Sequence, residues 1–333
     1  MSYINSVVDK VYVINLDKDT ERLKAIDKKL RDVGIAYERF PAILGSTIKS
    51  DHRLAGFCNE FCTDGIKGCA LSHHTIWEKA IYEGYDSILV LEDDAHIDSE
   101  IHEKVRDLMT RVPDWDIIYV GCRTYCNNEY ATNKALHTVL GTGPKPVDEK
   151  GDLSHVSGSA GAHAIMYRTR FLKKIINEPI YTHIDMELFR WISRTKAKAF
   201  GLYPEIVPLN EEMANTSNLS DTFPPLFNTL FNKVELSDHV PLGWVMSENL
   251  FKLGGLYINP LLITLILLCC IAPLWLLGLL VGWLTLELAM SSDFKNYFRF
   301  LTVMCFTVLL RYGLVKGVDR VKEGFYGIRR WTG

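Results

Sequence analysis

Two patterns that would point to common classes of binding protein are missing from the first 240 residues. No basic stripe interleaved with aromatic residues occurs there, and the formal net charge of the whole chain is -3, so nothing predicts a nucleic-acid partner. No G-x-G-x-x-G follows the first predicted strand, so the glycine fingerprint of dinucleotide-binding proteins is absent. No internal repeat is visible either.

An N-terminal secretory signal is also not visible. Met1 to Lys10 is short and polar, and Val11 to Leu16 is too brief for the apolar core of such a signal. We therefore expect the front of the chain to stay in the cytosol.

Cysteine is sparse, with eight residues in the chain. Two pairs, Cys58 with Cys62 and Cys122 with Cys126, share the spacing C-x3-C. This spacing fits a zinc site or the two ends of a disulfide. In a cytosolic chain we expect free thiols.

Charge is absent from Leu253 to Leu286, a run of 34 residues. One helix crosses a bilayer core with about 20 residues. Pro273 lies near the middle of the run, with Gly278 and Gly282 after it. These residues suit a helical hairpin or a re-entrant segment, because proline and glycine interrupt helices.

A second apolar run, Phe300 to Leu310, is flanked by arginines and is expected to be too short to span a membrane. Basic residues alternate with apolar ones from Leu314 to Arg330, which predicts a basic amphipathic helix on the membrane surface, in contact with anionic lipid. We therefore divide the chain into a folded domain at 1–240, an apolar hairpin or re-entrant segment at 241–290 and a basic tail at 291–333.

Because basic flanks prefer the cytosolic side, both ends of the apolar run should be cytosolic. We expect a membrane protein with its front domain on the cytoplasmic face. Asn215 and Asn218 fit the glycosylation acceptor pattern, which would matter only in a lumenal protein.

Strand and helix patterns alternate through the first 210 residues, which argues for one α/β domain. Val11 to Leu16 predicts a strand, Asp19 to Gly34 a capped helix and Ile35 to Ile43 a second strand. A helix from Ala70 to Ile81 leads into another strand at Ile88. The remaining expected segments are helices at 100–109 and 171–176, strands at 115–121, 163–167 and 199–207, and long loops at 45–65 and 123–152.

Three acids, Glu92, Asp93 and Asp94, directly follow the apolar run that starts at Ile88. Such a run is typical of a buried strand in a parallel sheet, whose carboxyl end lies at the edge where α/β proteins bind ligands. Adjacent carboxylates repel one another, so a divalent cation with oxygen ligands would stabilise them. The alternative is a solvated turn after a strand.

Polar residues near the first strand and on the second helix could complete a nucleotide site. Asn15, Asp17 and Arg22 surround the loop after the first strand, and Arg22 could pair with a diphosphate. On the helix, His73 could orient Ser72 or contact a donor. Alternatively, Arg22 is a surface residue and His73 only packs in the core.

Three separated segments resemble, in order and spacing, the pattern of glycosyltransferase family 25, which includes bacterial lipopolysaccharide galactosyltransferases and collagen galactosyltransferases. They are Val13-Ile-Asn-Leu-Asp-Lys-Asp-Thr-Glu-Arg22, Gly68-Cys-Ala-Leu-Ser-His73 with Trp77, and Leu89-Val-Leu-Glu-Asp-Asp-Ala95. The segments 115–121 and 157–167 and the pair Ile184-Asp185 are similar to later parts of the pattern, so the resemblance covers roughly residues 10 to 220.

The resemblance implies a Rossmann-like GT-A nucleotide-sugar fold and inverting transfer, usually of galactose, from a UDP-sugar. It also implies Mn²⁺ or Mg²⁺ held by an acidic motif. Glu92, Asp93 and Asp94 match that motif, with Asp94 as first metal ligand and Asp93 and Glu92 at the metal or the ribose.

Inversion also needs a base that takes a proton from the acceptor hydroxyl. Asp185 is the leading candidate because it opens a predicted helix after a strand and matches a family position; Glu187 and Asp221 are further candidates. Alternatively, Asp185 only caps its helix.

We expect a membrane-attached, metal-dependent glycosyltransferase that acts on a lipid-linked or surface glycan such as lipopolysaccharide. Two alternatives are a lumenal enzyme that glycosylates protein, as collagen is glycosylated, and a catalytically silent membrane scaffold or sugar-binding relative.

Overall fold

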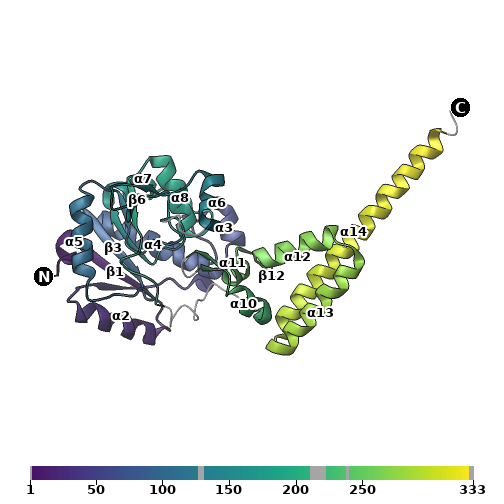
Figure 1. Cartoon of the computed structure of the whole chain (residues 1–333), viewed down its shortest axis with the longest axis horizontal. Coiled ribbons are helices and arrows are strands. Elements are labelled where there is room, and N and C mark those ends of the chain that lie inside the picture. The colour runs from purple at the N-terminus through teal and green to yellow at the C-terminus, as the bar shows by residue number, and fades with distance from the viewer. Residues whose placement is uncertain (1, 127–130, 211–222, 238–239, 255, 330–333) are drawn as a thin grey trace. The chain divides into compact units, whose positions relative to one another are not determined.

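The computed structural model describes every residue except 1, 127–130, 211–222, 238–239, 255 and 330–333 (Figure 1). The chain divides into two compact units. The front unit is Met1–Leu219 with Leu236–Val240, and the apolar unit is Ser220–Glu235 with Pro241–Gly333. Asp221, Asn215 and Asn218 lie outside the described residues.

An eight-stranded sheet forms the centre of the front unit, in the order β2-β1-β3-β7-β4-β8-β6-β5. β1 is parallel to β2 and β3, and β4 is parallel to β8, whereas β7 is antiparallel to both β3 and β4. The predicted α/β class is therefore confirmed, with a mixed rather than a purely parallel sheet. The strands are β1 Lys10–Asn15, β2 Glu38–Pro41, β3 Ser87–Glu92, β4 Ile117–Tyr119, β5 Lys145–Pro146, β6 Leu153–His155, β7 Ala164–Arg168 and β8 Ala199–Leu202.

Helices cover both faces of this sheet (Figure 1). Alternate side chains of a strand point to opposite faces, so Tyr12 and Ile14 of β1 lie in one core while Val11 and Val13 lie in the other. The first core includes residues of α4, α7 and α8, and the second includes residues of α1, α2 and α5. The helices of the front unit are α1 Ile4–Val7, α2 Thr20–Asp32, η1 Gly45–Thr47, α3 Gly56–Phe61, α4 Asp64–Tyr82, α5 Ile101–Arg111, α6 Ala131–Leu140, α7 Thr169–Ile175 and α8 Ile184–Thr195.

The periodic segments form as predicted, but the two expected loops contain helices. Residues 45–65 include η1 and α3, and α4 already begins at Asp64, where the Thr63 hydroxyl caps the helix by accepting a hydrogen bond from the Ile66 N–H at 3.3 Å. The sequence does not predict this first turn, because Gly65 and Gly68 lie in it and glycine is a weak helix former. Residues 123–152 likewise contain α6 and β5.

Both C-x3-C pairs are disulfides in the structure, where we expected free thiols. The Cα atoms are 4.5 Å apart for Cys58 and Cys62 and 6.0 Å apart for Cys122 and Cys126. These distances lie in the range that a disulfide bridges. The sequence shows the spacing, but only the backbone geometry places each pair within bonding reach.

The uncharged run at 253–286 is divided between two strands and two helices of the apolar unit. α12 ends at Ile271 and α13 begins after Pro273, so the helix is interrupted at the proline, as predicted. The elements after the front sheet are α10 Pro225–Phe231, β9 Glu235–Ser237, β10 Val240–Pro241, α11 Leu242–Ser247, β11 Phe251–Leu253, β12 Leu256–Ile258, α12 Pro260–Ile271, α13 Leu274–Ser291 and α14 Phe294–Arg329.

Charged side chains inside the apolar unit bind backbone groups at helix ends. Glu287 is fully buried and accepts hydrogen bonds from the backbone N–H groups of Leu226 and Phe227, at 2.6 and 2.9 Å. Arg311 of α14 donates to the carbonyls of Cys269 and Ala272 at the end of α12, at 3.3 and 2.5 Å. These contacts satisfy groups that helix ends otherwise leave unpaired.

The expectation that the run at Phe300 to Leu310 is too short to span a membrane is wrong. The helix does not stop at the flanking Arg299 and Arg311, and among the described residues Phe294–Leu314 alone is long and apolar enough to cross a bilayer. α12 is a shorter apolar helix of 12 residues. Length and composition therefore single out α14 within the described part of the chain.

Candidate functional site

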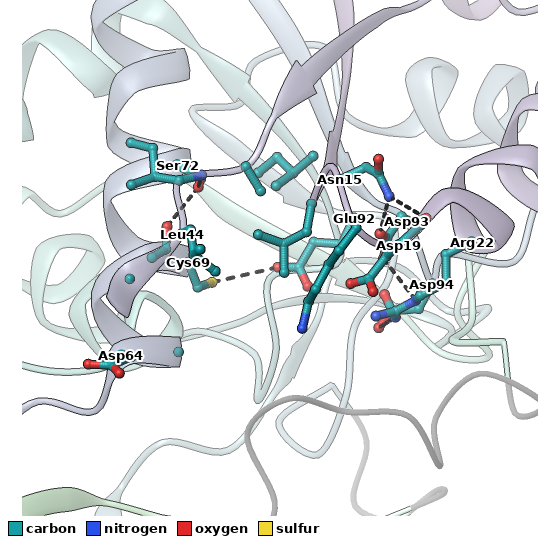
Figure 2. A pocket seen from close by; sticks show the side chains of 18 of the residues that line it. Asn15, Asp19, Arg22, Leu44, Asp64, Cys69, Ser72, Glu92, Asp93 and Asp94 are labelled. Atoms are coloured by element: carbon teal, nitrogen blue, oxygen red, sulfur yellow. Dashed lines mark hydrogen bonds and ion pairs between the residues drawn. The ribbon is translucent and has the colours of Figure 1, made fainter. Parts of the chain in front are cut away.

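A cavity of about 290 Å³ opens in the front unit at the carboxyl ends of β1 and β3 (Figure 2). β1 and β3 are parallel and Ile14 pairs with Glu92, so the residues that follow the two strands emerge side by side. The structure therefore brings the first-strand loop and the three acids together, as predicted. The other walls come from residues 42–46 and from the start of α4.

Asn15 and Arg22 hold the second and third acids of the motif in place. Asn15, buried at the end of β1, donates a hydrogen bond to an Asp93 carboxylate oxygen at 2.7 Å. Arg22 of α2 lies 3.1 Å from the Asp93 carboxylate and 2.7 Å from that of Asp94. Arg22 is thus a partner of the acidic motif and not a free surface residue.

Glu92 points toward α4 rather than toward Arg22 (Figure 2). Its Oε1 atom lies 3.1 Å from Nε2 of His73 and 3.9 Å from Sγ of Cys69. Ser72 is buried and accepts a hydrogen bond from the Ile43 N–H at 2.9 Å, while its hydroxyl donates to the Gly68 carbonyl. Ser72 therefore anchors the wall of the cavity.

The carboxylates at the cavity are hard to ionise together. Burial, followed by the charge of Glu92, raises the pKa of Asp94 to about 7, and burial also raises the pKa of Asp93. For Glu92, burial acts to raise the pKa, but the His73 hydrogen bond and charge outweigh it and the net pKa is lowered. The site thus combines Glu92, whose ionised form is favoured, with Asp93 and Asp94, which have too little positive charge nearby to ionise at their usual pKa.

This arrangement fits a hard divalent cation. The Oδ1 atom of Asp94 is buried and has no hydrogen-bond partner among the described residues. Carboxylate oxygens are the ligands that Mn²⁺ and Mg²⁺ prefer, and a cation would supply the charge that lowers the pKa of both acids. Asp94 and Asp93 are the residues that would hold it.

The base candidates are placed differently from one another. Asp185 lies in the first turn of α8 and accepts hydrogen bonds from the N–H groups of Gly161 and Met186 at 3.0 and 2.8 Å. Burial raises its pKa, and the negative charge of Glu92 acts in the same direction, so the two carboxylates interact electrostatically. Asp185 does not line the cavity itself.

Glu187 is buried and its oxygens are occupied by local contacts. It accepts hydrogen bonds from the N–H groups of Tyr181 and Thr182 and pairs with Arg190. These contacts fix the start of α8. Asp17 is exposed and pairs with Arg39, a residue of β2 that also donates to Asn15 and that the sequence pattern did not single out.

Sequence reasoning also missed the loop walls of the cavity. Leu44, Gly45, Ser46 and Asp64 line it, although they lie in a segment without periodicity. Two glycines are signals for this contact. A Cβ atom at Gly68 of α4 would lie 2.5 Å from the Ile43 carbonyl, and one at Gly45 would lie 1.6 Å from the Asp64 carbonyl, so only glycine lets the loop approach.

Comparison with known proteins finds relatives for the part of the chain that holds the cavity. Residues 8–151 match the family model described as glycosyltransferase family 25 (LPS biosynthesis protein). A glycosyltransferase 25 family member of Aedes aegypti is 31% identical over 128 residues, which is 34% of this chain and 21% of that protein.

Two further relatives differ in what their names say of activity. Procollagen galactosyltransferase 1 of Danio rerio is 30% identical over 128 residues, and a probable inactive glycosyltransferase 25 family member 3 of Rattus norvegicus is 28% identical over 128 residues. Each match covers 34% of this chain, and 21% and 22% of the two proteins respectively. The chain spans about a fifth of the length of these relatives.

Proposed function

We propose that this chain, whose residues 8–151 match the family model of glycosyltransferase family 25, is a metal-dependent enzyme that transfers a sugar from a UDP-sugar, with galactose as the first candidate. The observation that carries the proposal is that all lining residues of the cavity lie between Ile14 and Asp94, within the matched segment. The acids, their partners and the cavity thus coincide with the part of the chain that matches the family model.

The donor's diphosphate would bind near Asp93 and Asp94, whose carboxylates would hold the divalent cation. Mn²⁺ or Mg²⁺ bound there supplies positive charge that stabilises the departing diphosphate. Asn15 and Arg22 keep the two carboxylates oriented. A GT-A fold is part of this proposal, and the parallel β1 and β3, with their carboxyl ends at the cavity, support it.

Asp185 is proposed to be the base that takes the proton from the acceptor hydroxyl, as the sugar inverts at its anomeric carbon. Burial raises its pKa, which favours proton uptake. Glu187 is a poorer candidate, because both of its oxygens already have partners.

Release of UDP from UDP-sugars tests the enzyme proposal. The wild type should release UDP in the presence of Mn²⁺, and Asp94→Ala should lose at least about two orders of magnitude of this rate, the usual cost of removing a group that stabilises charge in the reaction. Asp32→Ala, a change of an exposed acid in α2, should leave the rate unchanged. Equal release by wild type and Asp94→Ala would favour a silent relative, like the one named inactive.

The expected acceptor is a lipid-linked or surface glycan on the cytoplasmic face of a membrane. α14 supports attachment, because Phe294–Leu314 is long and apolar enough to cross a bilayer. Attachment would raise the effective concentration of a lipid-linked acceptor at the active site.

A second topology places the front unit on the lumenal side, with a protein acceptor. Two disulfides favour it, because such bonds persist in oxidising compartments. If α14 crosses the membrane, the basic residues of the tail and the front unit are on different sides of the bilayer. Because basic flanks prefer the cytosol, the front unit would then be lumenal. These tail residues are Lys316, Arg320, Lys322, Arg329 and Arg330.

Two measurements on the full chain expressed in eukaryotic cells separate the topologies. A lumenal front unit should carry glycans at Asn215 or Asn218 that a glycosidase removes and that Asn→Gln changes abolish. Its four paired cysteines should resist alkylation until reductant is added. A glycan-free protein in which these four cysteines react without reductant would support the cytoplasmic topology.

A further inference from the structure

Three side chains of different chemistry converge at one wall of the cavity. Cys69, His73 and Glu92 each offer one ligand atom, and these atoms all lie within 4.8 Å of one another. The Nε2 atom of His73 is 3.1 Å from Oε1 of Glu92, and Sγ of Cys69 is 3.9 Å from the same oxygen. Figure 2 shows the contact between Cys69 and Glu92.

The fold explains why they meet. Cys69 and His73 are four residues apart on α4, so both side chains lie on one face of the helix. Glu92 is the last residue of β3, against which this face packs. His73 is fully buried, and its Nδ1 atom has no hydrogen-bond partner among the described residues. Among the described residues, Glu92 is thus the hydrogen-bond partner of this imidazole, through its Nε2 atom.

A thiol, an imidazole and a carboxylate are not the ligand set of a hard cation. Mg²⁺ and Mn²⁺ prefer oxygen, whereas Zn²⁺ binds sulfur, nitrogen and oxygen together, often with three protein ligands and one open position. Cys69 is one of the free cysteines, so its sulfur is available. We propose that Cys69, His73 and Glu92 form a zinc site, separate from the position for a hard cation at Asp93 and Asp94.

The open coordination position would face the cavity. Cys69 and Glu92 both line the cavity, whereas His73 is buried behind them. Bound zinc would then present its fourth position to a ligand in the cavity, such as a phosphate oxygen of the donor, and would withdraw Glu92 from other contacts. Only this consequence for the donor rests on the proposed function; zinc binding itself does not.

Titration of the metal-free full chain with Co²⁺ tests the site without any measurement of transfer. Co²⁺ takes the place of Zn²⁺, and a bound thiolate gives a sulfur-to-cobalt charge-transfer band in the ultraviolet. On binding, the thiol proton of Cys69 goes to the solvent. The wild type should show the band at one equivalent, and Zn²⁺ should abolish it by displacing Co²⁺.

Variants assign the band to its ligands. Cys69→Ser should abolish it, and His73→Gln should weaken Co²⁺ binding by at least about tenfold, since even partners outside the ligand shell change metal affinity by that much. Cys270→Ser, which removes an exposed free thiol of the apolar unit, should keep the band. Asp94→Ala should also keep it, because Asp94 belongs to the other position. A band that persists in Cys69→Ser, or that disappears in Cys270→Ser, overturns the proposal.

X-ray absorption of the zinc-loaded wild type guards against misfolding of the variants. The zinc shell should contain one sulfur at about 2.3 Å, with nitrogen and oxygen as the other ligands. A shell of nitrogen and oxygen alone, a shell with two or more sulfurs, or no bound zinc equivalent, overturns the proposal. If zinc binds as expected and no UDP-sugar is turned over, the zinc site stands and the proposed function fails.

Discussion

Asp94 is a residue whose proposed function conflicts with the stability of the fold. One of its oxygens pairs with Arg22 and the other has no partner in the described part of the chain. Burial, with the nearby charge of Glu92, raises its pKa from 3.8 to about 7. A carboxylate that is costly to ionise in the metal-free protein is stabilised most by a bound cation. The electrostatic cost of ionising Asp94 is therefore consistent with a role as metal ligand.

This conflict predicts a pH-dependent gain in stability for Asp94→Asn. The unfolded chain loses the Asp94 proton near pH 4 and the folded protein near pH 7, so the free energy of unfolding of the wild type falls as the pH rises between these values. Asparagine removes that loss. The difference between the two pKa values corresponds to at most about 4 kcal/mol.

Urea unfolding with chelator present measures this effect. Asp94→Asn should be more stable than the wild type at pH 8, and the gain should shrink as the pH approaches 4. Added Mn²⁺ should stabilise the wild type more than the variant. A gain of the same size at every pH would mean that the pKa of Asp94 is not raised.

Asp185 invites a different test, because its oxygens also have a local structural role. Asp185→Asn keeps one side-chain oxygen, which can accept from the Gly161 N–H, but it loses the acceptor of the Met186 N–H and removes the base. We expect kcat for sugar transfer to fall about 10²- to 10⁴-fold, the usual contribution of a general base, with a loss of stability no larger than about 1 to 3 kcal/mol, the cost of one unpaired group. A variant that loses stability and keeps kcat would assign Asp185 to helix capping alone.

At the scale of elements, the sequence predicts the strands and helices whose bounds are set by local interactions. β1, α2 and β3 form within a few residues of the expected bounds, because their apolar spacing and Gly34, with φ of 70°, act locally; the Asp19 side chain makes no cap hydrogen bond. The meeting of Asn15, Arg22 and the three acids could also be inferred, because parallel strands place their carboxyl ends together. This part of the site is therefore readable from the sequence.

Contacts between segments that are distant in the chain could not be predicted from the sequence. Glu92 is close in sequence to the other two acids, yet it turns to His73 and Cys69 on α4. The loop at 42–46 and the start of α4 form cavity walls through packing against each other, for which no periodic signal exists. The antiparallel direction of β7 likewise depends on the whole sheet and not on its own residues.

The contact of α4 with the loop predicts that Gly68→Ala damages the cavity. The new Cβ atom would lie 2.5 Å from the Ile43 carbonyl and 3.0 Å from the Gly45 nitrogen. Overpacking of this kind usually costs about 1 to 3 kcal/mol, and the shifted loop should weaken UDP-sugar binding. Gly56→Ala in α3 is the matched control, because its Cβ atom would meet nothing within 4 Å. Denaturant unfolding and donor titration of both variants measure the two effects, and equal stability would show that the loop gives way freely.

For the whole molecule, the distribution of apolar side chains separates the two units. The apolar unit satisfies Glu287 and Arg311 with backbone groups but leaves large apolar side chains exposed, including Ile271, Trp275 and Leu309 at 77%, 69% and 69%. Scattered exposed apolar residues are normal on a soluble protein, but their concentration on successive helices marks an interaction surface. Glu287 and Arg311, which bind backbone groups within the unit, and apolar side chains that face outward suit contact with lipid.

This distribution predicts that one charge on α14 detaches the protein from membranes more effectively than a charge elsewhere. Leu309→Lys changes an exposed residue within Phe294–Leu314, so it should not disturb packing inside the unit. A lysine at the centre of a spanning helix costs about 2.5 to 3.5 kcal/mol of insertion free energy. Leu309 lies between the centre and the end of Phe294–Leu314, so the cost there is smaller, and the fraction that resists carbonate extraction should fall accordingly. Tyr82→Lys at the end of α4 exchanges another exposed large side chain, in the front unit, and should leave that fraction unchanged. If both variants remain in the membrane like the wild type, α14 is not the anchor, and the apolar surface of α12 and α13 becomes the attachment to test.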